Sequence, residues 1–467
     1  MVGEVSGGMV GEVSGGMVGA VVGALVGEVV GAVVAQAPRP YPGAPGPTTA
    51  RCNNQPRRHR TMMMRPSSFS LIHPPAGFVE NPYPVYATLR VQEPVCWIGS
   101  NTVLLTRYRD VMTVYRAPAA SSDKRREFGA KFGEQSPLFE HHTTSLVFSD
   151  PPLHTRVRRL LMAALHARAL APMEGDLVRR VNELIDAIDT PGEHELVADF
   201  AAPIPIEVIG NLLGIPARER SPLRQWSLDI LSALEPQPSA SILAQGNSAV
   251  GEFSCFLRDL IGERRRRPKD PDTDLLSRLI QGEVDGERLS EGELVHQCIF
   301  LLNAGHETTT NLMANGVVAL LCHRPQWKML CADEGLLASA IEECLRYESP
   351  LQLNNRVLLQ PLSLGNAGEG LRLEAGTFVT LGIGAANRDP EVFEDPDRFD
   401  IRRKANHQLA FGHGAHACAG MNVARFEARI ALNALRKRLP DLALAGPPER
   451  DSRIRFRGFR SVPIVRA

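Results

Sequence analysis

One short segment near the C-terminus limits most strongly what this chain can fold into. It runs from Phe411 to Gly420 and reads FGHGAHACAG, and the stretch 421–436 that follows is rich in good helix formers. Gly412 and Gly414 let the backbone turn tightly and come close to something flat and bulky. A thiolate at Cys418 would face the free N–H groups of a helix N-terminus, which lower the pKa of a thiol. The segment therefore predicts a loop built around one charged cysteine sulfur.

Such a loop suits a haem iron held by the single axial thiolate of Cys418, because sulfur is a soft ligand and the glycines permit close approach. Two alternatives are open. Cys418 can be an ordinary small buried side chain, or it can form a zinc site together with His407, His413 and His416. That zinc spacing is not one of the usual paired arrangements, and it leaves the phenylalanine and the glycines without a role. The haem interpretation is therefore favoured.

The loop pattern F-G-x-G-x-H-x-C-x-G resembles the cysteine-ligand loop of the cytochrome P450 family. A second stretch, AGHETT at 304–309, resembles the family's oxygen-activating motif A-G-x-[DE]-T. Apart from the resemblance, the stretch is explained by a small residue at a helix crossing. A carboxylate and a hydroxyl follow it, and such groups can relay protons. The resemblance implies that Ala304 and Gly305 lie against haem b. It also implies that Glu307 and Thr308 are the acid and the alcohol beside bound O₂.

A third stretch, DPPLHTRVR at 150–158, is similar to the family's D-P-P-x-H-x-x-x-R segment. His154 and Arg158 are spaced i, i+4 and share a helix face, which a generic basic helix would also explain. The resemblance implies that both bind the haem propionates, that Arg356 and His416 do the same, and that Phe411 contacts the cofactor. Cys418 remains the metal ligand.

A weaker signal is the pair formed by Glu343 and Arg346, which lie three residues apart and can meet on one helix face. In the family this E-x-x-R pair binds an arginine further along the chain. The resemblance implies that Arg398 supplies it and that the three residues support the cysteine loop without taking part in chemistry.

Composition excludes several other classes of function. The 467 residues carry 52 basic and 52 acidic side chains, so no general attraction to nucleic acid or anionic lipid is expected. The arginine run 264–267 precedes a proline and several aspartates and is expected to be a solvated helix end. The eight cysteines are scattered without a C-x-x-C pair, which favours a reducing compartment and predicts a cytoplasmic protein.

The first 61 residues differ from the rest. An eight-residue repeat is followed by a segment of mainly valine, glycine and alanine, with glycines 19, 23, 27 and 31 spaced by four. That spacing also occurs where membrane helices pack, but Glu28 and the high glycine content make insertion poor. We expect 1–61 to be a disordered low-complexity tail and linker, with a membrane-associated segment as the alternative, and 62–467 to be the cytochrome P450 domain.

The remaining chain is predicted to be mostly α with a small β region. The resemblance implies the cytochrome P450 fold, in which haem lies between a long distal helix and the helix that follows the cysteine loop. Strands are expected at 95–106 and 356–383, with a turn at 374–377. Helical patterns cover the ranges 153–170, 176–189, 242–267, 291–323 and 336–347.

The resemblance implies a haem-thiolate monooxygenase of the soluble bacterial type, which activates O₂ with two electrons and hydroxylates or otherwise oxidises a small hydrophobic substrate. A ferredoxin-type donor with its NAD(P)H reductase would supply the electrons, since this sequence carries no flavin or iron–sulfur motif. The alternatives are a peroxygenase or isomerase that needs no external electrons, and a non-enzymatic haem sensor. Substrate choice is expected to depend on loops at 117–144 and 203–247, on the distal helix and on 351–355.

Overall fold

The computed structural model describes residues 69–165, 170–271, 274–284, 286–365 and 371–466. All of them belong to one of the two units into which the chain divides, Ala50–Ala467. The expected disordered tail and linker, 1–61, lie outside the described residues. Within these ranges, no helix is both long and apolar enough to cross a membrane.

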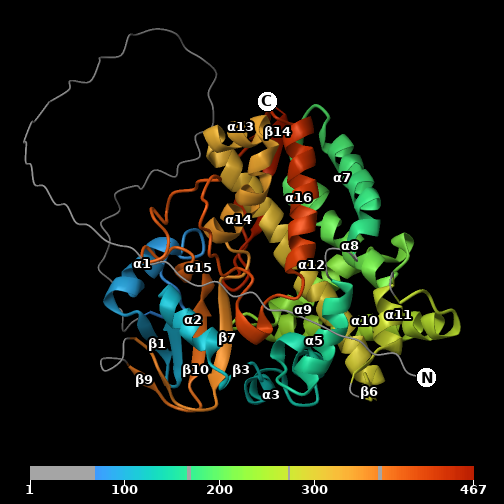
Figure 1. The fold of residues 1–467 in the computed structure, drawn as a ribbon, viewed down its shortest axis with the longest axis vertical. Coiled ribbons are helices and arrows are strands. Elements are labelled where there is room, and N and C mark those ends of the chain that lie inside the picture. The colour runs from blue at the N-terminus through green and yellow to red at the C-terminus, as the bar shows by residue number, and fades with distance from the viewer. Residues whose placement is uncertain (1–68, 166–169, 272–273, 285, 366–370, 467) are drawn as a thin grey trace, which may run out of the picture. The chain divides into compact units, whose positions relative to one another are not determined.

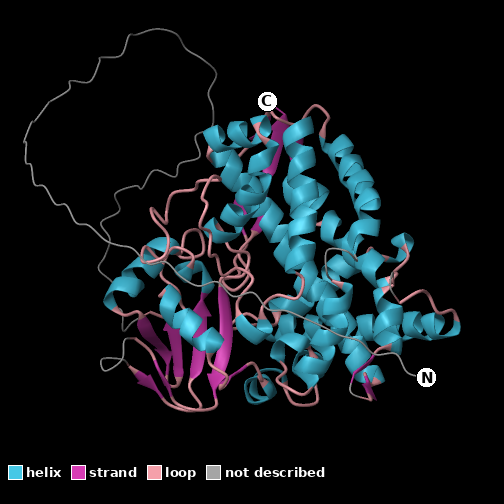
Figure 2. Cartoon of the chain, viewed as in Figure 1, coloured by secondary structure: helices cyan, strands magenta, loops and turns pink. Residues whose placement is uncertain are grey.

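Helices make up most of the described chain (Figures 1 and 2). They are α1 (Tyr83–Gln92), α2 (Tyr108–Arg116), α3 (Arg125–Phe132), α4 (Pro137–Thr144), α5 (Leu153–Ala164), α7 (Glu174–Ile188), α8 (Pro203–Leu213), α9 (Leu223–Ser232), α10 (Ala240–Arg266), α11 (Leu275–Gln281), α12 (Glu291–Cys322), α13 (Arg324–Ala332), α14 (Leu337–Tyr347), α15 (Ile383–Ala386) and α16 (Met421–Arg438).

The largest sheet has five strands in the order β1-β2-β10-β7-β3, and Figure 2 shows its strands gathered at one side of the helices. Its pairs are antiparallel except β2 with β10, which run parallel. The members are β1 (Val95–Gly99), β2 (Thr102–Leu105), β3 (Ala120–Ser121), β7 (Leu353–Leu358) and β10 (Phe378–Gly382). Smaller sheets contain β4 (Glu193–Glu195), β5 (Glu283–Val284), β6 (Glu287–Arg288), β8 (Leu362–Ser363), β9 (Arg372–Leu373), β11 (Leu442–Leu444), β12 (Glu449–Arg450), β13 (Phe459–Ser461) and β14 (Pro463–Arg466).

The helix α12 organises the helical part of the fold. It starts at a capping box, in which the Ser290 side chain accepts from the N–H of Glu293 while the Glu293 side chain accepts from the N–H of Ser290. Its 32 residues span about 48 Å. Because it contacts α4, α8, α9, α10, α14 and α16, nearly every side chain along it is covered. The helix therefore packs both against helices that precede it in the chain and against α14 and α16, which follow it.

Most sequence predictions of structure agree with the observed elements. The mostly helical fold with a small sheet is confirmed, as is the turn at 374–377, where the Thr377 N–H donates to the Glu374 carbonyl and Gly376 has a φ of +84°. The first part of the predicted helix 153–170 is observed as α5, which ends at Ala164, and 166–169 lie outside the described residues. The prediction of loops at 117–144 and 203–247 is wrong. Those segments contain α3, α4, α8, α9 and the start of α10, whose apolar faces are buried against the core.

Candidate functional site

The loop that precedes α16 is fixed by backbone hydrogen bonds. The N–H of Cys418 donates to the carbonyl of Phe411 at 2.8 Å, which closes the loop across its base. Gly412 and Gly414 have φ values of +65° and +76°, a conformation that favours glycine. At Gly414 a Cβ would lie 2.6 Å from the carbonyl oxygen of Tyr115, so any larger residue would push α2 away from the loop.

The electrostatics around the Cys418 sulfur correct one expectation. The Gly420 N–H and the nearby Arg158 and Arg425 lower the pKa of the thiol, as a helix N-terminus should. Burial raises the pKa by more, so the net shift in the protein alone is upward. A bound metal cation reverses that balance, because a coordinating thiol loses its proton. The sulfur is therefore placed to become a thiolate when it ligates iron.

The zinc alternative is wrong for this arrangement. Across the described ranges, no group of three or more His, Cys, Asp or Glu side chains is positioned to hold a metal ion. His407, His413 and His416 therefore do not converge with Cys418 on a shared four-ligand site. The sulfur has an apolar cavity beside it instead.

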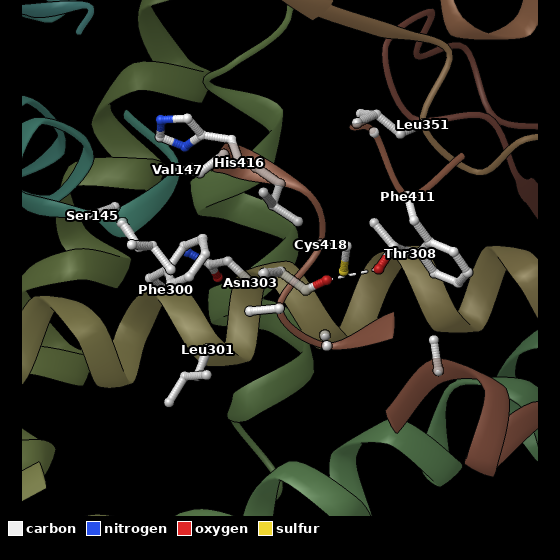
Figure 3. Close-up of a pocket in the computed structure, with 18 of the residues that line it drawn as sticks. Ser145, Val147, Phe300, Leu301, Asn303, Thr308, Leu351, Phe411, His416 and Cys418 are labelled. Carbon is white, nitrogen blue, oxygen red and sulfur yellow. Dashed lines mark hydrogen bonds between the residues drawn. The ribbon is translucent and has the colours of Figure 1, made fainter. Parts of the chain in front are cut away.

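This cavity has a volume of about 290 Å³ and lies between the cysteine loop and α12 (Figure 3). Cys418 lines it from the loop and Thr308 from α12. The hydroxyl of Thr308 donates to the carbonyl of Ala304 at 2.7 Å. Seven of the sequence-predicted residues line this cavity, namely Arg158, Ala304, Gly305, Thr308, Phe411, His416 and Cys418.

Gly305 has a second structural reason to be small. A Cβ at this position would lie 2.7 Å from Cδ1 of Ile209, which belongs to α8. The glycine therefore allows α8 to pack closely on α12, and it also lines the cavity. Both the close helix crossing and the open cavity wall depend on the missing side chain.

Glu307 does not line the cavity that its neighbour Thr308 lines. Its side chain is 4% exposed, and Oε1 accepts from Arg453 Nη2 at 2.5 Å and from Asn311 Nδ2 at 3.1 Å. Arg453 also donates to Asp451 at 2.7 Å. The structure thus brings the expected alcohol to the cavity and holds the expected acid in an ion-pair network behind it. No local pattern indicated Arg453, which lies 146 residues further along the chain.

The four expected propionate partners lie near one another, and two of them, Arg158 and His416, line the cavity. The rings of His154 and His416 lie 4.1 Å apart between centroids. The pKa of Arg356 is lowered chiefly by burial, and its hydrogen bonds go to the neutral oxygens of Asn354 and Asn355. Arg158 has a pKa lowered by the same cause.

Asp150 is the carboxylate that acts on this cationic group, raising the pKa of His154 and of Arg356 against the larger effect of burial. Among the described residues neither Arg158 nor Arg356 forms an ion pair, and His154 Nε2 is buried without a hydrogen-bond partner. Positive charge crowds the site strongly enough that burial and Arg356 lower the pKa of His416 to about 3. Two propionates would supply the missing negative charge and acceptors. The donor set therefore fits haem b bound at Cys418.

The supporting network under the loop corrects another expectation. Arg346 donates from Nε and Nη2 to the two carboxylate oxygens of Glu343, both at 2.8 Å, and both side chains are fully buried. The second arginine at Glu343 is Arg403, whose Nε lies 3.2 Å from the carboxylate. Arg398 was expected there, but its side chain is exposed and pairs with Asp400. Only the backbone carbonyl of Arg398 joins the network, accepting from Arg346.

Comparison with known proteins gives one consistent match. The family model for cytochrome P450 matches residues 95–335 and 323–438. The chain is 39% identical over 397 residues to a vitamin D(3) 25-hydroxylase of Pseudonocardia autotrophica, covering 83% of this chain and 94% of that protein. It is 37% identical over 401 residues to the cytochrome P450 monooxygenase PikC of Streptomyces venezuelae, with 83% and 91% covered.

Solved structures give the same match. P450BioI in complex with an acyl carrier protein that carries hexadec-9Z-enoic acid superimposes with a TM-score of 0.77 at 33% identity, covering 83% of this chain and 99% of that one. CYP109E1 of Bacillus megaterium in complex with testosterone gives a TM-score of 0.72 at 31% identity, with the same shares covered.

Proposed function

We propose a specific reaction for this chain from the premise that it belongs to the cytochrome P450 family and is a monooxygenase that binds haem b. The reaction is the insertion of one oxygen atom from O₂ into a C–H bond of a hydrophobic small molecule. Two electrons come from a separate ferredoxin-type donor with its NAD(P)H reductase. The second oxygen atom leaves as water after two protons have been delivered.

One observation carries this proposal: Cys418 and Thr308 line the same apolar cavity from two different elements. When bound, haem b supplies the binding and reductive activation of O₂. The chain's own contribution would be to hold the cofactor through the sulfur of Cys418 and to present Thr308 and the substrate in the same cavity. The propionates would be held by His154, Arg158, Arg356 and His416, with Ala304, Gly305 and Phe411 against the ring.

Proton delivery is the second task of α12. The oxygen of Thr308, whose proton goes to Ala304, keeps lone pairs free for a hydrogen bond from a group in the cavity. Arg453, which binds Glu307, and Asp451, which binds Arg453, also line a second hollow. In our proposal protons enter from that hollow, reach the Glu307 carboxylate, and pass to the Thr308 hydroxyl when the Glu307 side chain turns from Arg453 toward the cavity.

The substrate class is supported by the lining of the cavity. Most lining side chains are leucine, isoleucine, valine and phenylalanine, supplied by α3, α8 and α12 among others. Removing such surface from water favours binding of an apolar molecule. The relatives named for vitamin D(3) hydroxylation and solved with testosterone bind large apolar compounds, in agreement with this lining.

The test is a reconstituted reaction with haem-loaded protein, a surrogate ferredoxin with its reductase, NADPH and a panel of apolar compounds. Compounds that shift the haem absorption are then assayed for a product that contains one atom of ¹⁸O₂. Dependence of product on both NADPH and the ferredoxin would support the proposal. Full turnover with hydrogen peroxide alone, and none with the donor system, would favour a peroxygenase.

A further inference from the structure

Three buried polar side chains from α4 and α12 stand among the mainly apolar residues that line the cavity. His141 and His142 come from α4 and Asn303 comes from α12, and all three line the cavity. They are exposed by only 1%, 1% and 4%. Figure 3 shows Asn303 on the same stretch of α12 as Thr308. Because Asn303 precedes Thr308 by five residues, the two lie about 8 Å apart along the helix axis.

These side chains present hydrogen-bonding atoms that the described protein does not use. Both ring nitrogens of His142, Nδ1 of His141 and Oδ1 of Asn303 are buried without a partner. A buried polar atom left unpaired is costly, so such groups are usually satisfied by protein, water or ligand. All four atoms are covered in this conformation, so a bound molecule satisfies them when the side chains turn toward the cavity that they line.

The histidines are neutral at physiological pH. Burial, followed by the nearby charge of Lys131, lowers the pKa of His142 to about 3. Burial and the two neighbouring histidines hold the pKa of His141 well below 6.5. A neutral imidazole offers one N–H donor and one acceptor nitrogen. The three side chains can therefore recognise a group that both donates and accepts, and they have no charge with which to bind a carboxylate.

The hydrogen bond between Asn303 and His141 decides which of their remaining polar atoms donate and which accept. Asn303 Nδ2 lies 3.2 Å from His141 Nε2. If the amide donates there, His141 carries its proton on Nδ1 and offers it as a donor, while Asn303 keeps Oδ1 as an acceptor. His142 adds one further donor and one further acceptor from a setting of Phe128, Phe132 and Phe148 rings. The three side chains thus offer both hydrogen-bond donors and hydrogen-bond acceptors.

We propose that the substrate is an apolar molecule with a hydroxyl group, which binds His141, His142 and Asn303 while a carbon some distance away faces the oxidising centre. This inference rests on the proposed monooxygenase function and adds the substrate class. The three polar side chains set the orientation of the substrate, and the apolar lining residues supply most of its affinity. A hydroxyl fits best because it both donates and accepts.

The cavity also contains cations that could attract a different class of substrate. Arg158 and Arg455 line it. Lys124 lines it too, with its Nζ 3.7 Å from Oε2 of Glu127, another lining residue. The lysine charge is therefore already matched by a carboxylate. A fatty-acid substrate anchored at Lys124 is the competing outcome that the experiment must separate.

The experiment titrates the haem-loaded enzyme with 1-dodecanol, dodecanoic acid and dodecane, which share a chain length and differ only in their end group. Dissociation constants come from the haem absorption change and are checked by calorimetry. The alcohol is expected to bind about ten-fold more tightly than the alkane, as one or two buried hydrogen bonds allow. It should also bind more tightly than the acid.

Two variants test whether His142 and Asn303 cause the preference for the alcohol, and a third variant serves as control. His142→Phe keeps the ring shape and removes both nitrogens, and Asn303→Leu removes the acceptor at similar volume. Each should reduce the preference for the alcohol to about two- or three-fold. His306→Phe is the matched control, since His306 is 1% exposed with both nitrogens unpartnered but does not line the cavity. It should keep the full preference. If His142→Phe does not fold, Asn303→Leu decides the matter.

The possible outcomes are distinct. Equal binding of the three probes, or a preference that survives both variants, overturns the inference. Tightest binding of dodecanoic acid that is lost in Lys124→Met replaces it with a charge-anchored substrate. The carbon monoxide spectrum of the reduced enzyme is recorded throughout. A spectrum without thiolate character refutes the proposed function itself, whereas a normal spectrum with no end-group preference refutes only the binding of a hydroxyl by the three polar side chains.

Discussion

The carboxylate of Glu307 is bound by the guanidinium of Arg453, with 2.5 Å between Oε1 and Nη2. Both side chains are almost fully buried, and Arg453 binds Asp451 as well. The residue expected to deliver protons is thus held in an ion pair behind α12, one position along the chain from the hydroxyl that lines the cavity. Proton delivery through Glu307 requires that this pair open and close.

Substitution of Arg453 should destabilise the protein more than substitution of Glu307. Arg453→Met leaves the carboxylates of Glu307 and Asp451 without their cation and is expected to lower the free energy of unfolding by about 3–5 kcal/mol. Glu307→Gln should cost less, because Arg453 keeps Asp451 as a partner. The double variant should be more stable than the sum of the single effects predicts.

The measurement is urea unfolding of the four haem-loaded proteins. Arg179→Met is the control, because Arg179 forms an exposed pair with Asp176 at 2.6 Å and its loss should change the free energy of unfolding little. Additive effects of the two buried substitutions would show that Glu307 and Arg453 are not coupled.

In turnover, Glu307→Gln should be slower than the parent and should change its dependence on pH.

Thr308→Ala should separate substrate binding from proton delivery. The hydroxyl is bonded within its own helix to Ala304 and touches none of the expected propionate partners, so haem content and substrate affinity should be kept. General acid–base assistance typically contributes about 10²–10⁴-fold to rate. Its loss should therefore divert NADPH into hydrogen peroxide. The quantity to measure is product formed per NADPH oxidised. Thr308→Ser, which keeps the hydroxyl, should couple nearly as well as the parent, and equal coupling in Thr308→Ala would refute the role.

Cys418→Ala should abolish the thiolate-type absorption band of the reduced carbon monoxide complex. The sulfur lines the cavity, and within the described chain no alternative metal-binding cluster exists. Cys298→Ala is the matched control, because Cys298 is fully buried in α12 and does not line the cavity. It should keep the band with at most a small loss of stability. An unchanged band in Cys418→Ala would remove the basis of the proposed site.

The features predicted from sequence are those that lie close together along the chain. The cysteine loop and the Thr308 segment each carry their groups within ten residues, so a local resemblance to family motifs could predict them. Arg403 was missed in favour of Arg398, because which of two nearby arginines turns inward depends on the path of the loop that carries them. The pairing of His141 with Asn303 joins residues 162 positions apart. No local pattern encodes such a contact, which exists only after α4 has packed on α12.

A chain that starts at Met62 should bind haem and give the same carbon monoxide spectrum as the full chain. The first described helix starts at Tyr83, and the first core residue is Phe69, which is 3% exposed. The deletion therefore removes none of the contacts described above. Haem content per chain and the unfolding midpoint are the quantities to compare. Loss of haem would give the N-terminal segment a structural role, and membrane partitioning of the full chain alone would favour the anchor hypothesis.

The acid stability of the enzyme should depend on its buried neutral histidines. Burial, followed by the charges of Arg224 and Arg453, lowers the pKa of His306 to about 3, whereas an unfolded histidine has a pKa near 6.5. Since the unfolded state binds more protons between these values, His306 contributes stability above pH 6.5 that is lost as the pH falls. From pH 7.5 to 5.5 the loss amounts to about 1 kcal/mol. His306→Phe should therefore reduce the decrease in unfolding free energy between pH 7.5 and 5.5 by that amount. Parallel curves for His306→Phe and the parent would contradict the argument.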